Sequence, residues 1–457
     1  LIRAILLCEA QLLFNGGIGT YVKAAAESHA DVGDKANDAI RVDGADLRVQ
    51  VVAEGGNLGL TQRGRIEFAR AGGKINTDAI DNSAGVDCSD HEVNIKILLN
   101  RQVGSGSAGA LSPGQRDALL VEMTDEVAAL VLADNAAQNA LLGVGRGHAA
   151  EMVSVHGRLV KHLEQDRGLD RRLEALPTRA QFAALQSAGQ GLSSPELCTL
   201  LAHVKLTLTD EVLASDLPDA AVFRGRLPEY FPRPLRERFL DAIRVHPLRR
   251  EITTTLLVNE VVDGGGMTYA YRLAEDMSAS ATDAVRAYVV ATTVFDLPGT
   301  WRAITELGTS VPASVSDAMM LESRRLLDRV SRWLLLNRPQ PLAVGAEISR
   351  FGPIVRALAP QVPDWLTGRE AQDVAVAVGR LAGQGVPEQL ASRISAGLDS
   401  FGLLDVVEVT ELAERDATGT IELGEQQAER VAELYYALSA HLDVDRMLGS
   451  VSELQRG

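Results

Sequence analysis

Two apolar runs near the start of the sequence each end in a glycine-rich turn, and this repeat constrains the fold most strongly. Residues 11–14 (QLLF) run into 15–19 (NGGIG), and residues 48–53 (RVQVVA) run into 54–57 (EGGN). A short apolar run that stops at such a turn is typical of a buried strand. We therefore expect two buried strands, each followed by a tight turn.

Helical segments are expected after both turns, at residues 20–30 and 61–71, and residues 74–76 could form a third strand. This order of strand, turn and helix is typical of a parallel sheet whose strands are joined by helical crossovers. Ligands of such sheets bind beyond the carboxyl ends of the strands. Both glycine-rich turns follow strands, so both are predicted to lie at that edge.

Polar and small residues continue after the second turn, up to an apolar helix expected at 92–101. They include residues 81–85 (DNSAG). Glycine loses the most conformational entropy on folding, and clustered polar groups must all find partners. Such a combination at two strand ends is usually kept for a ligand site, so residues 51–96 form the candidate site.

The individual signals leave alternatives open. Val22 stands where the third glycine of a dinucleotide fingerprint belongs, so residues 15–19 could be a tight turn without a ligand. Asn57 offers a donor and an acceptor that suit a carboxamide, but asparagine also stabilises its own turn. Ser89 could donate to a carboxylate, or it could cap a helix together with Glu92, three residues on.

No metal site is expected in this stretch. His91 stands between Asp90 and Glu92, but no matching distant ligands are evident in the sequence, and a surface or supporting role is the plainer interpretation. Cys88 lies inside the candidate site without a base at the spacing of a nucleophilic pair. We therefore expect Cys88 to be a small buried residue.

The charge balance and the cysteines limit the possible partners and compartment. The formal net charge of −16 argues against nucleic acid, whose phosphates require a basic surface. No uninterrupted apolar run is long enough to suggest a membrane span, and no signal peptide is recognised. The three cysteines are far apart and have neither disulfide nor zinc spacing, which favours a reducing compartment.

Strand signals nearly vanish after residues 102–113, a Gly/Ser-rich break that is the best candidate for a domain boundary. Long helices are expected at 114–165, and residues 193–196 (SSPE) mark a clear helix start. Alanine and leucine dominate this half, and both favour helix. The second half is therefore predicted to be a large multi-helix domain.

The candidate site resembles the end of the nucleotide-binding domain of glutamate dehydrogenases. The positions that occur in the family's order and at matching spacing are Glu54-Gly55-Gly56-Asn57, Thr61, Asp78, residues 82–86 (NSAGV), Ser89 and Glu92. Longer segments, among them LLFNGGIGTYVKA, EGGNLGLTQRGRIEFA and SSPELCTLLAHVK, are similar to the very large bacterial NAD-dependent glutamate dehydrogenases. The resemblance covers nearly the whole chain.

The resemblance implies a fold class of α/β plus all-α. It predicts the C-terminal part of a Rossmann-type dinucleotide-binding domain followed by a large multi-helix domain. We place the limits at residues 1–101 for the Rossmann-type part, 102–165 for a linker and connecting helices, and 166–457 for the helical domain. The implied reaction is the NAD-dependent oxidative deamination of L-glutamate to 2-oxoglutarate and ammonia.

The resemblance also implies which residues contact the cofactor. Gly16, Gly17 and Ile18 would line its edge, and Asn57 and Asn82 would lie at its nicotinamide end. The choice of NAD over NADP follows from the resemblance alone, because the residues that recognise the adenosine ribose follow an earlier strand.

On the substrate side, the resemblance implies that Val86 and Ser89 face the substrate, with Ser89 binding the side-chain carboxylate of glutamate. Two departures from the family pattern keep the residues small. Gly56 stands where many relatives have Ala, and Ser83-Ala84 stands where they have Ala-Gly.

The family's catalytic Lys and Asp, its substrate-carboxylate lysines and its pyrophosphate loop would lie before Leu1. The catalytic residues are therefore unknown from this sequence, and we expect the C-terminal portion of a longer enzyme that is inactive alone. We further expect a cytoplasmic homo-oligomer that binds a small-molecule substrate, with no nucleic acid, membrane or metal partner.

Two other interpretations stay open. The chain could be a helical scaffold or regulatory protein that carries a non-catalytic remnant of a dinucleotide-binding fold, or an amino-acid dehydrogenase of another specificity. The sequence before Leu1 would discriminate the scaffold from an enzyme, because an enzyme requires a strand with Gly-x-Gly-x-x-Gly and an earlier lysine-bearing glycine motif.

Overall fold

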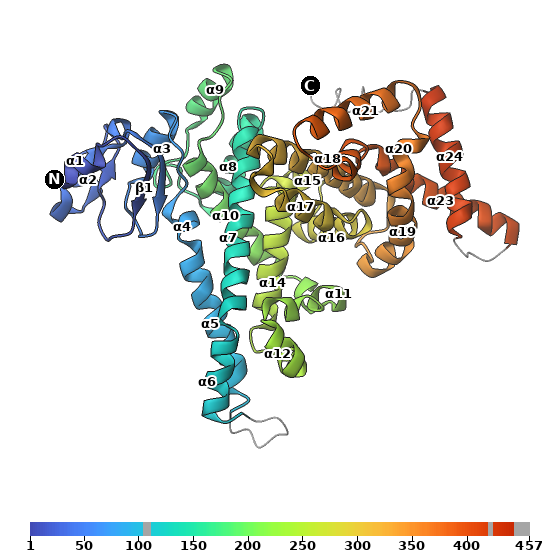
Figure 1. Ribbon diagram of the computed structural model, residues 1–457, viewed down its shortest axis with the longest axis horizontal. Helices are drawn as coiled ribbons and strands as arrows, with labels where there is room; N and C mark the ends of the chain where they lie inside the picture. Colours follow the sequence, from blue (N-terminus) through green and yellow to red (C-terminus); the bar gives the residue numbers. More distant parts are fainter. Residues whose placement is uncertain (104–110, 419–423, 443–457) are drawn as a thin grey trace. The chain divides into compact units, whose positions relative to one another are not determined.

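A computed structural model describes residues 1–103, 111–418 and 424–442 of the chain (Figure 1). It contains two compact units, Leu1–Tyr271 and Arg272–Gly457, and the division falls within helix α15 (Tyr269–Met277). The predicted domain limits at 101 and 165 stay predictions, and the predicted Gly/Ser-rich boundary lies largely outside the described residues.

The first unit opens with two pairs of parallel strands. Strand β1 (Ala10–Asn15) pairs with β4 (Val49–Glu54), with Asn15 opposite Glu54 at the carboxyl ends. The two-residue strands β2 (Val22–Lys23) and β3 (Val42–Asp43) form the second pair. The two strands predicted from the glycine-terminated runs are thus present and parallel, and the helix predicted at 61–71 is confirmed as α3 (Gln62–Arg70).

Two predictions about local structure here are wrong. Residues 20–30 do not form a helix, because Val22 joins a strand with Val42 and only α2 (His29–Val32), capped by Ser28, is helical. The run at 11–14 is not fully buried either, since Leu12 and Phe14 are 54% and 64% exposed. The predicted third strand is reduced to a single bridge between Lys74 and Val51.

A compact apolar core holds the strands and α3 together. Its buried members come from both strand pairs, from α3 and from the loops between them: Leu6, Val22, Val42, Leu47, Val49, Val52, Leu60, Phe68 and Ile75. The short helix α1 (Ile2–Leu6) supplies Leu6 to this core. The carboxyl ends of β1 and β4 are therefore fixed relative to α3, which is what a site at that edge requires.

Helix α5 (Ser83–Asn100) follows the one-turn helix α4 (Asp78–Asp81) and runs beside α7 (Thr124–Gly147), as Figure 1 shows. The predicted helix at 92–101 is therefore real but begins nine residues earlier. The far half of α5 contributes Ile95, Leu98 and Leu99 to a second core, which includes Leu119 of α6 (Pro113–Glu122).

The rest of the first unit is helical within the described residues. Helix α10 (Ser194–Leu213) begins as predicted, with a capping box between Ser193 and Glu196 and a proline in the first turn. The remaining helices of this unit are α8 (Val153–Arg167), α9 (Arg179–Ser187), α10 (Ser194–Leu213), α11 (Ala221–Arg224), α12 (Arg233–Arg238), α13 (Leu240–Arg244) and α14 (Arg249–Asn259), with the π-helical turn η5 (Glu260–Gly264).

The second unit consists of helices and short helical turns in its described part. Its helices are α16 (Ala281–Val294), α17 (Leu297–Glu306), α18 (Ala313–Asn337), α19 (Val344–Leu358), α20 (Val362–Trp365), α21 (Gly368–Gly383), α22 (Glu388–Ser395), α23 (Leu403–Thr418) and α24 (Glu425–Leu442). A core that includes Ile304, Met319 and Leu390 packs α17, α18 and α22 together. The large helical part predicted from composition is confirmed.

Among the described residues, α7 is long and apolar enough to cross a membrane by length and composition. This is weak evidence for a span, because core helices of soluble proteins have the same properties. Leu141, Leu142 and Val144 of α7 are buried in the first unit. Its Asn135 and Asn139 form hydrogen bonds to Ile80, Ser83 and Asn76, so the helix contacts protein rather than lipid along this side.

Candidate functional site

The two glycine-rich turns meet beyond the carboxyl ends of β1 and β4. The backbone N–H groups of Gly55 and Gly56 both donate to the carbonyl oxygen of Asn15, at 2.9 and 3.0 Å. A Cβ atom at Gly56 would lie 2.5 Å from the carbonyl oxygen of Gly17. The second turn therefore has room only for a glycine where it contacts the first turn.

The first turn is exposed and is fixed at its far end. Gly16 and Gly17 are exposed, and Ile18 is 96% exposed. The hydroxyl of Thr20 donates to the carbonyl oxygen of Leu58 at 2.8 Å, which links the two turns a second time. Leu58 has a φ of 58°, a left-handed conformation that is uncommon for a branched residue and is often found at binding sites.

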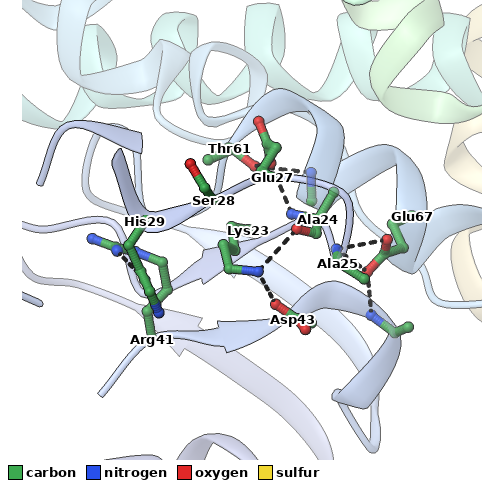
Figure 2. Close-up of polar contacts among 12 residues, drawn as sticks. Lys23, Ala24, Ala25, Glu27, Ser28, His29, Arg41, Asp43, Thr61 and Glu67 are labelled. Carbon is green, nitrogen blue, oxygen red and sulfur yellow. Dashed lines mark hydrogen bonds and ion pairs between the residues drawn. The ribbon is translucent and has the colours of Figure 1, made fainter. Parts of the chain in front are cut away.

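A polar network behind these turns fixes β2, β3 and the start of α3 (Figure 2). Lys23 is buried and forms an ion pair with Asp43. Glu27 accepts hydrogen bonds from the Ala24 N–H at 2.8 Å and from the Thr61 hydroxyl at 2.6 Å, and Thr61 also caps α3. Because Lys23 is held in this network, it is a structural residue of the fold.

A buried ion pair lies directly beneath the second turn. Both carboxylate oxygens of Glu54 accept hydrogen bonds from the Arg65 guanidinium, at 2.6 and 2.9 Å, and neither side chain is more than 4% exposed. The same guanidinium lies 3.2 Å from Asp78. Glu54 also accepts from the N–H of Leu60, so the turn closes over this pair.

Burial raises the pKa of Glu54, and the ion pair with Arg65 acts in the opposite direction. For Arg65, burial lowers the pKa but Glu54 and Asp78 outweigh it, so the guanidinium stays charged. Burial also raises the pKa of Asp81, whose carboxylate accepts a hydrogen bond from the Glu54 N–H at 3.0 Å. The Arg65 guanidinium therefore acts on all three of these carboxylates, those of Glu54, Asp78 and Asp81.

The structure brings together Asn57 and Asn82, two of the predicted site residues. The Asn82 Nδ2 donates to the Asn57 Oδ1 at 3.2 Å, and Asn82 stands at the N-terminal end of α5. This bond leaves the Nδ2 group of Asn57 as a donor and the Oδ1 atom of Asn82 as an acceptor. A carboxamide needs one donor and one acceptor side by side, so the pair is complementary to such a group.

Val86 and Ser89 lie on the exposed side of α5, and Val86 is 65% exposed. Ser89 is in the second turn, where its hydroxyl donates to the Gly85 carbonyl oxygen of its own helix at 3.3 Å. The alternative that Ser89 caps a helix with Glu92 is wrong. Helix α5 starts at Ser83, where Asn135 of α7 donates to the Ser83 hydroxyl and to the Ile80 carbonyl oxygen.

Cys88 is exposed, so the prediction that it is buried is wrong. The prediction followed from the lack of a base at the spacing of a nucleophilic pair, which does not determine exposure, and α5 places Cys88 on a solvent-facing side. His91, for which a surface role was one alternative, is buried at 2% exposure.

The residues that support the site were not predicted from the sequence. They are Leu58, Arg65, and Asp78 and Asp81 in their contacts with the pair of Glu54 and Arg65. The clue was the charge of Glu54 at the end of a predicted buried strand, because a buried carboxylate requires a cation nearby. Arg63 and Arg65, nine and eleven residues later on the predicted helix, were the nearest cations after Glu54 in the sequence, and Arg65 forms the pair.

Comparison with known families assigns both parts of the chain. Residues 1–145 match the model of the bacterial NAD-glutamate dehydrogenase catalytic domain. Residues 189–457, more than half of the chain, match the model of the glutamate dehydrogenase C-terminal region.

Curated relatives agree with both matches. The chain is 52% identical over 456 residues to an NAD-specific glutamate dehydrogenase of Mycobacterium tuberculosis. It is 42% and 39% identical to proteins of the same name from Pseudomonas aeruginosa and Halomonas elongata. These alignments cover 99–100% of the chain but 27% of each relative, so the chain spans about a quarter of their length. With its C-terminal region matched over more than half of its residues, and the segment that carries the candidate site matched to the bacterial catalytic domain, this chain belongs to the glutamate dehydrogenase family.

Proposed function

We propose that this chain is part of an enzyme that oxidatively deaminates L-glutamate to 2-oxoglutarate and ammonia with NAD. The proposal assigns the exposed edge beyond β1 and β4 to the nicotinamide half of the cofactor and the start of α5 to the substrate. The names of the relatives support the choice of glutamate and NAD.

The observation that carries the proposal is the hydrogen-bonded pair of Asn57 and Asn82. The Nδ2 group of Asn57 and the Oδ1 atom of Asn82, which this bond does not use, match the carboxamide of nicotinamide. Asn57 would donate to the carboxamide oxygen, and Asn82 would accept from its nitrogen. The exposed turn at Gly16, Gly17 and Ile18 lies against the same strand ends and lets the backbone approach the cofactor closely. NAD, when bound, supplies the acceptor for the hydride from the Cα atom of glutamate.

On the substrate side, we assign the side-chain carboxylate of glutamate to Ser89. Its hydroxyl is exposed on the second turn of α5 and bonds only weakly, at 3.3 Å, to its own helix. A carboxylate would form a shorter, charge-assisted hydrogen bond with the same hydroxyl. Val86, one turn earlier on the exposed side, would contact the aliphatic part of the substrate.

We further infer that β1 and β4 belong to a Rossmann-type sheet. The supports are their parallel pairing, the glycine turns at their carboxyl ends and the exposure of Leu12 and Phe14 on β1. On this proposal the catalytic lysine and aspartate come from another part of the full-length protein, which also supplies further strands. Cys8, Cys88 and Cys198 carry free thiols, which supports a cytoplasmic, reducing location. We also propose a homo-oligomer.

The direct test is the initial rate of NAD reduction by the full-length protein with L-glutamate, L-alanine and L-leucine as alternative substrates and NADP as alternative cofactor. We expect reduction with L-glutamate and NAD, and much slower rates with each alternative. Reduction that is fastest with an apolar amino acid would instead support a dehydrogenase of other specificity, and no reduction with any pair would support a non-catalytic role.

A further inference from the structure

We propose that Asp87, His91 and Asp134 form a binding site for a divalent first-row metal ion, such as Mn²⁺ or Zn²⁺, which links α5 to α7. One potential ligand atom from each of the three side chains lies within 4.8 Å of the other two. Two ligands on opposite sides of such an ion lie about 4 Å apart, so small rotamer shifts would complete the coordination. The proposal is independent of the dehydrogenase function.

The histidine is the observation that points to a ligand. His91 is 2% exposed, and its Nδ1 atom has no hydrogen-bond partner in the described structure. Its ring stacks on Tyr230 at a centroid distance of 4.2 Å, and its Nε2 atom lies 4.0 Å from Asp87, too far for a hydrogen bond. The imidazole is therefore held in one orientation by packing, without the polar contacts that a buried imidazole normally makes.

One of the two carboxylates shows the same deficiency. The Oδ2 atom of Asp87 is buried and also lacks a hydrogen-bond partner in the described residues. Asp134 is half-buried, and its carboxylate lies in the same group of potential ligand atoms as Asp87 and His91. A divalent cation would stabilise both carboxylates in their charged form.

Among the described residues, Lys205 is a cation that acts on both aspartates, but it does not fill this role. Its ammonium donates to Asn259 at 2.9 Å and forms an ion pair with Asp263. In its neutral form the His91 imidazole offers a ring nitrogen to a metal ion. One neutral nitrogen and two carboxylates suit Mn²⁺ or Zn²⁺ better than a soft ion.

No metal site was expected here from the sequence, and the acidic neighbours of His91 in the chain, Asp90 and Glu92, do not belong to the group. Asp134 belongs to a different helix, and only the packing of α5 against α7 brings it to His91. The ion would fix α7 against the second and third turns of α5, where Ser89 is two residues from both Asp87 and His91.

The test is a titration of Mn²⁺ into the chelator-treated full-length protein, followed by the loss of the EPR signal of the free ion. We expect one Mn²⁺ per chain, and an affinity lower by roughly tenfold or more in Asp134→Asn. The matched control is Asp125→Asn, which changes an exposed acid on the same helix and should bind like the wild type. Asp87→Asn provides an independent second variant if Asp134→Asn does not fold.

A second readout separates metal binding from a structural role. Mn²⁺ should raise the melting temperature of the wild type and of Asp125→Asn but not of Asp134→Asn. The proposal is overturned if the wild type binds no Mn²⁺ or Zn²⁺, or if Asp134→Asn and Asp87→Asn bind the ion as well as the wild type. Neither outcome depends on dehydrogenase activity.

Discussion

The Nδ2 atom of Asn82 lies 3.2 Å from the Oδ1 atom of Asn57, so the two predicted nicotinamide residues form one hydrogen-bonded unit. Asn57 comes from the turn after β4, and Asn82 comes from the N-terminal end of α5. The bond therefore fixes the separation between the cofactor side and the substrate side of the proposed site.

This unit predicts a non-additive response to mutation. Asn57→Ala and Asn82→Ala should each weaken NAD binding by roughly threefold to tenfold, because each loses a hydrogen bond of about 0.5–1.5 kcal/mol. In the double variant the loss should be smaller than the sum, since each single change already disturbs its partner. The measurement is the Kd of NAD in the full-length protein, with Asn100→Ala at the other end of α5 as a control. Strict additivity would contradict the paired role.

The contact between the two glycine turns predicts a specific effect of Gly56→Ala. The new Cβ would lie 2.5 Å from the Gly17 carbonyl oxygen, so the exposed first turn must move. Because that turn is exposed, the melting temperature should change little while the affinity for NAD falls. Gly114→Ala is the matched control, since a Cβ there meets nothing within 4 Å. Unchanged NAD affinity in Gly56→Ala would show that the first turn does not line the cofactor site.

The buried ion pair predicts a large stability loss on Arg65→Met. The substitution leaves Glu54 buried without its cation, and removing one partner of a buried pair typically costs about 3–5 kcal/mol. Arg48→Met is the control, because Arg48 pairs with Glu9 on the surface and such pairs contribute less than about 1 kcal/mol. Urea titrations of the full-length protein, followed by circular dichroism, would compare the two variants. Equal midpoints would mean that the pair does not hold the second turn.

His156 predicts how stability depends on pH. This histidine of α8 is 3% exposed, and burial lowers its pKa from 6.5 to about 4. A depressed folded-state pKa means that stability is present above pH 6.5 and is lost as the pH falls toward 4, by about 3 kcal/mol at pH 4. His156→Leu should remove most of this loss, whereas His162→Leu, exposed on the same helix, should keep it. The measurement is the melting temperature between pH 4 and pH 7.5. An identical pH dependence in wild type and His156→Leu would contradict this account.

The sequence predicted those parts of the fold that depend on short-range patterns. The two strands at 11–14 and 48–53 and the helix α3 follow from apolar runs that end at glycine or polar turns. The residues 20–30 were predicted wrongly because β2 exists only through its pairing with Val42, which lies far along the chain. A two-residue strand has no periodicity of its own to detect.

The residues of the candidate site also divide into those that short-range patterns indicate and those that depend on long-range packing. Gly16, Gly17 and Asn57 could be proposed because each follows a predicted strand, whereas Asn82 was proposed from the family resemblance; their roles stay predictions. The exposure of Cys88 and the position of Ser89 could not be predicted, because α5 begins where it contacts Asn135 of α7. The approach of Asp134 to His91 depends on the same packing of two helices, which no local pattern encodes.

The central claim is that the exposed side of α5 binds the substrate, and Ser89→Ala in the full-length protein tests it most directly. The control is Ser187→Ala on α9, an exposed serine whose hydroxyl likewise bonds a carbonyl oxygen four residues earlier. Loss of a hydrogen bond to a charged carboxylate, about 1.5–3 kcal/mol, predicts a KM for L-glutamate roughly 10- to 100-fold higher in Ser89→Ala, with the KM for NAD nearly unchanged. A KM for glutamate that equals that of Ser187→Ala and the wild type would contradict the account.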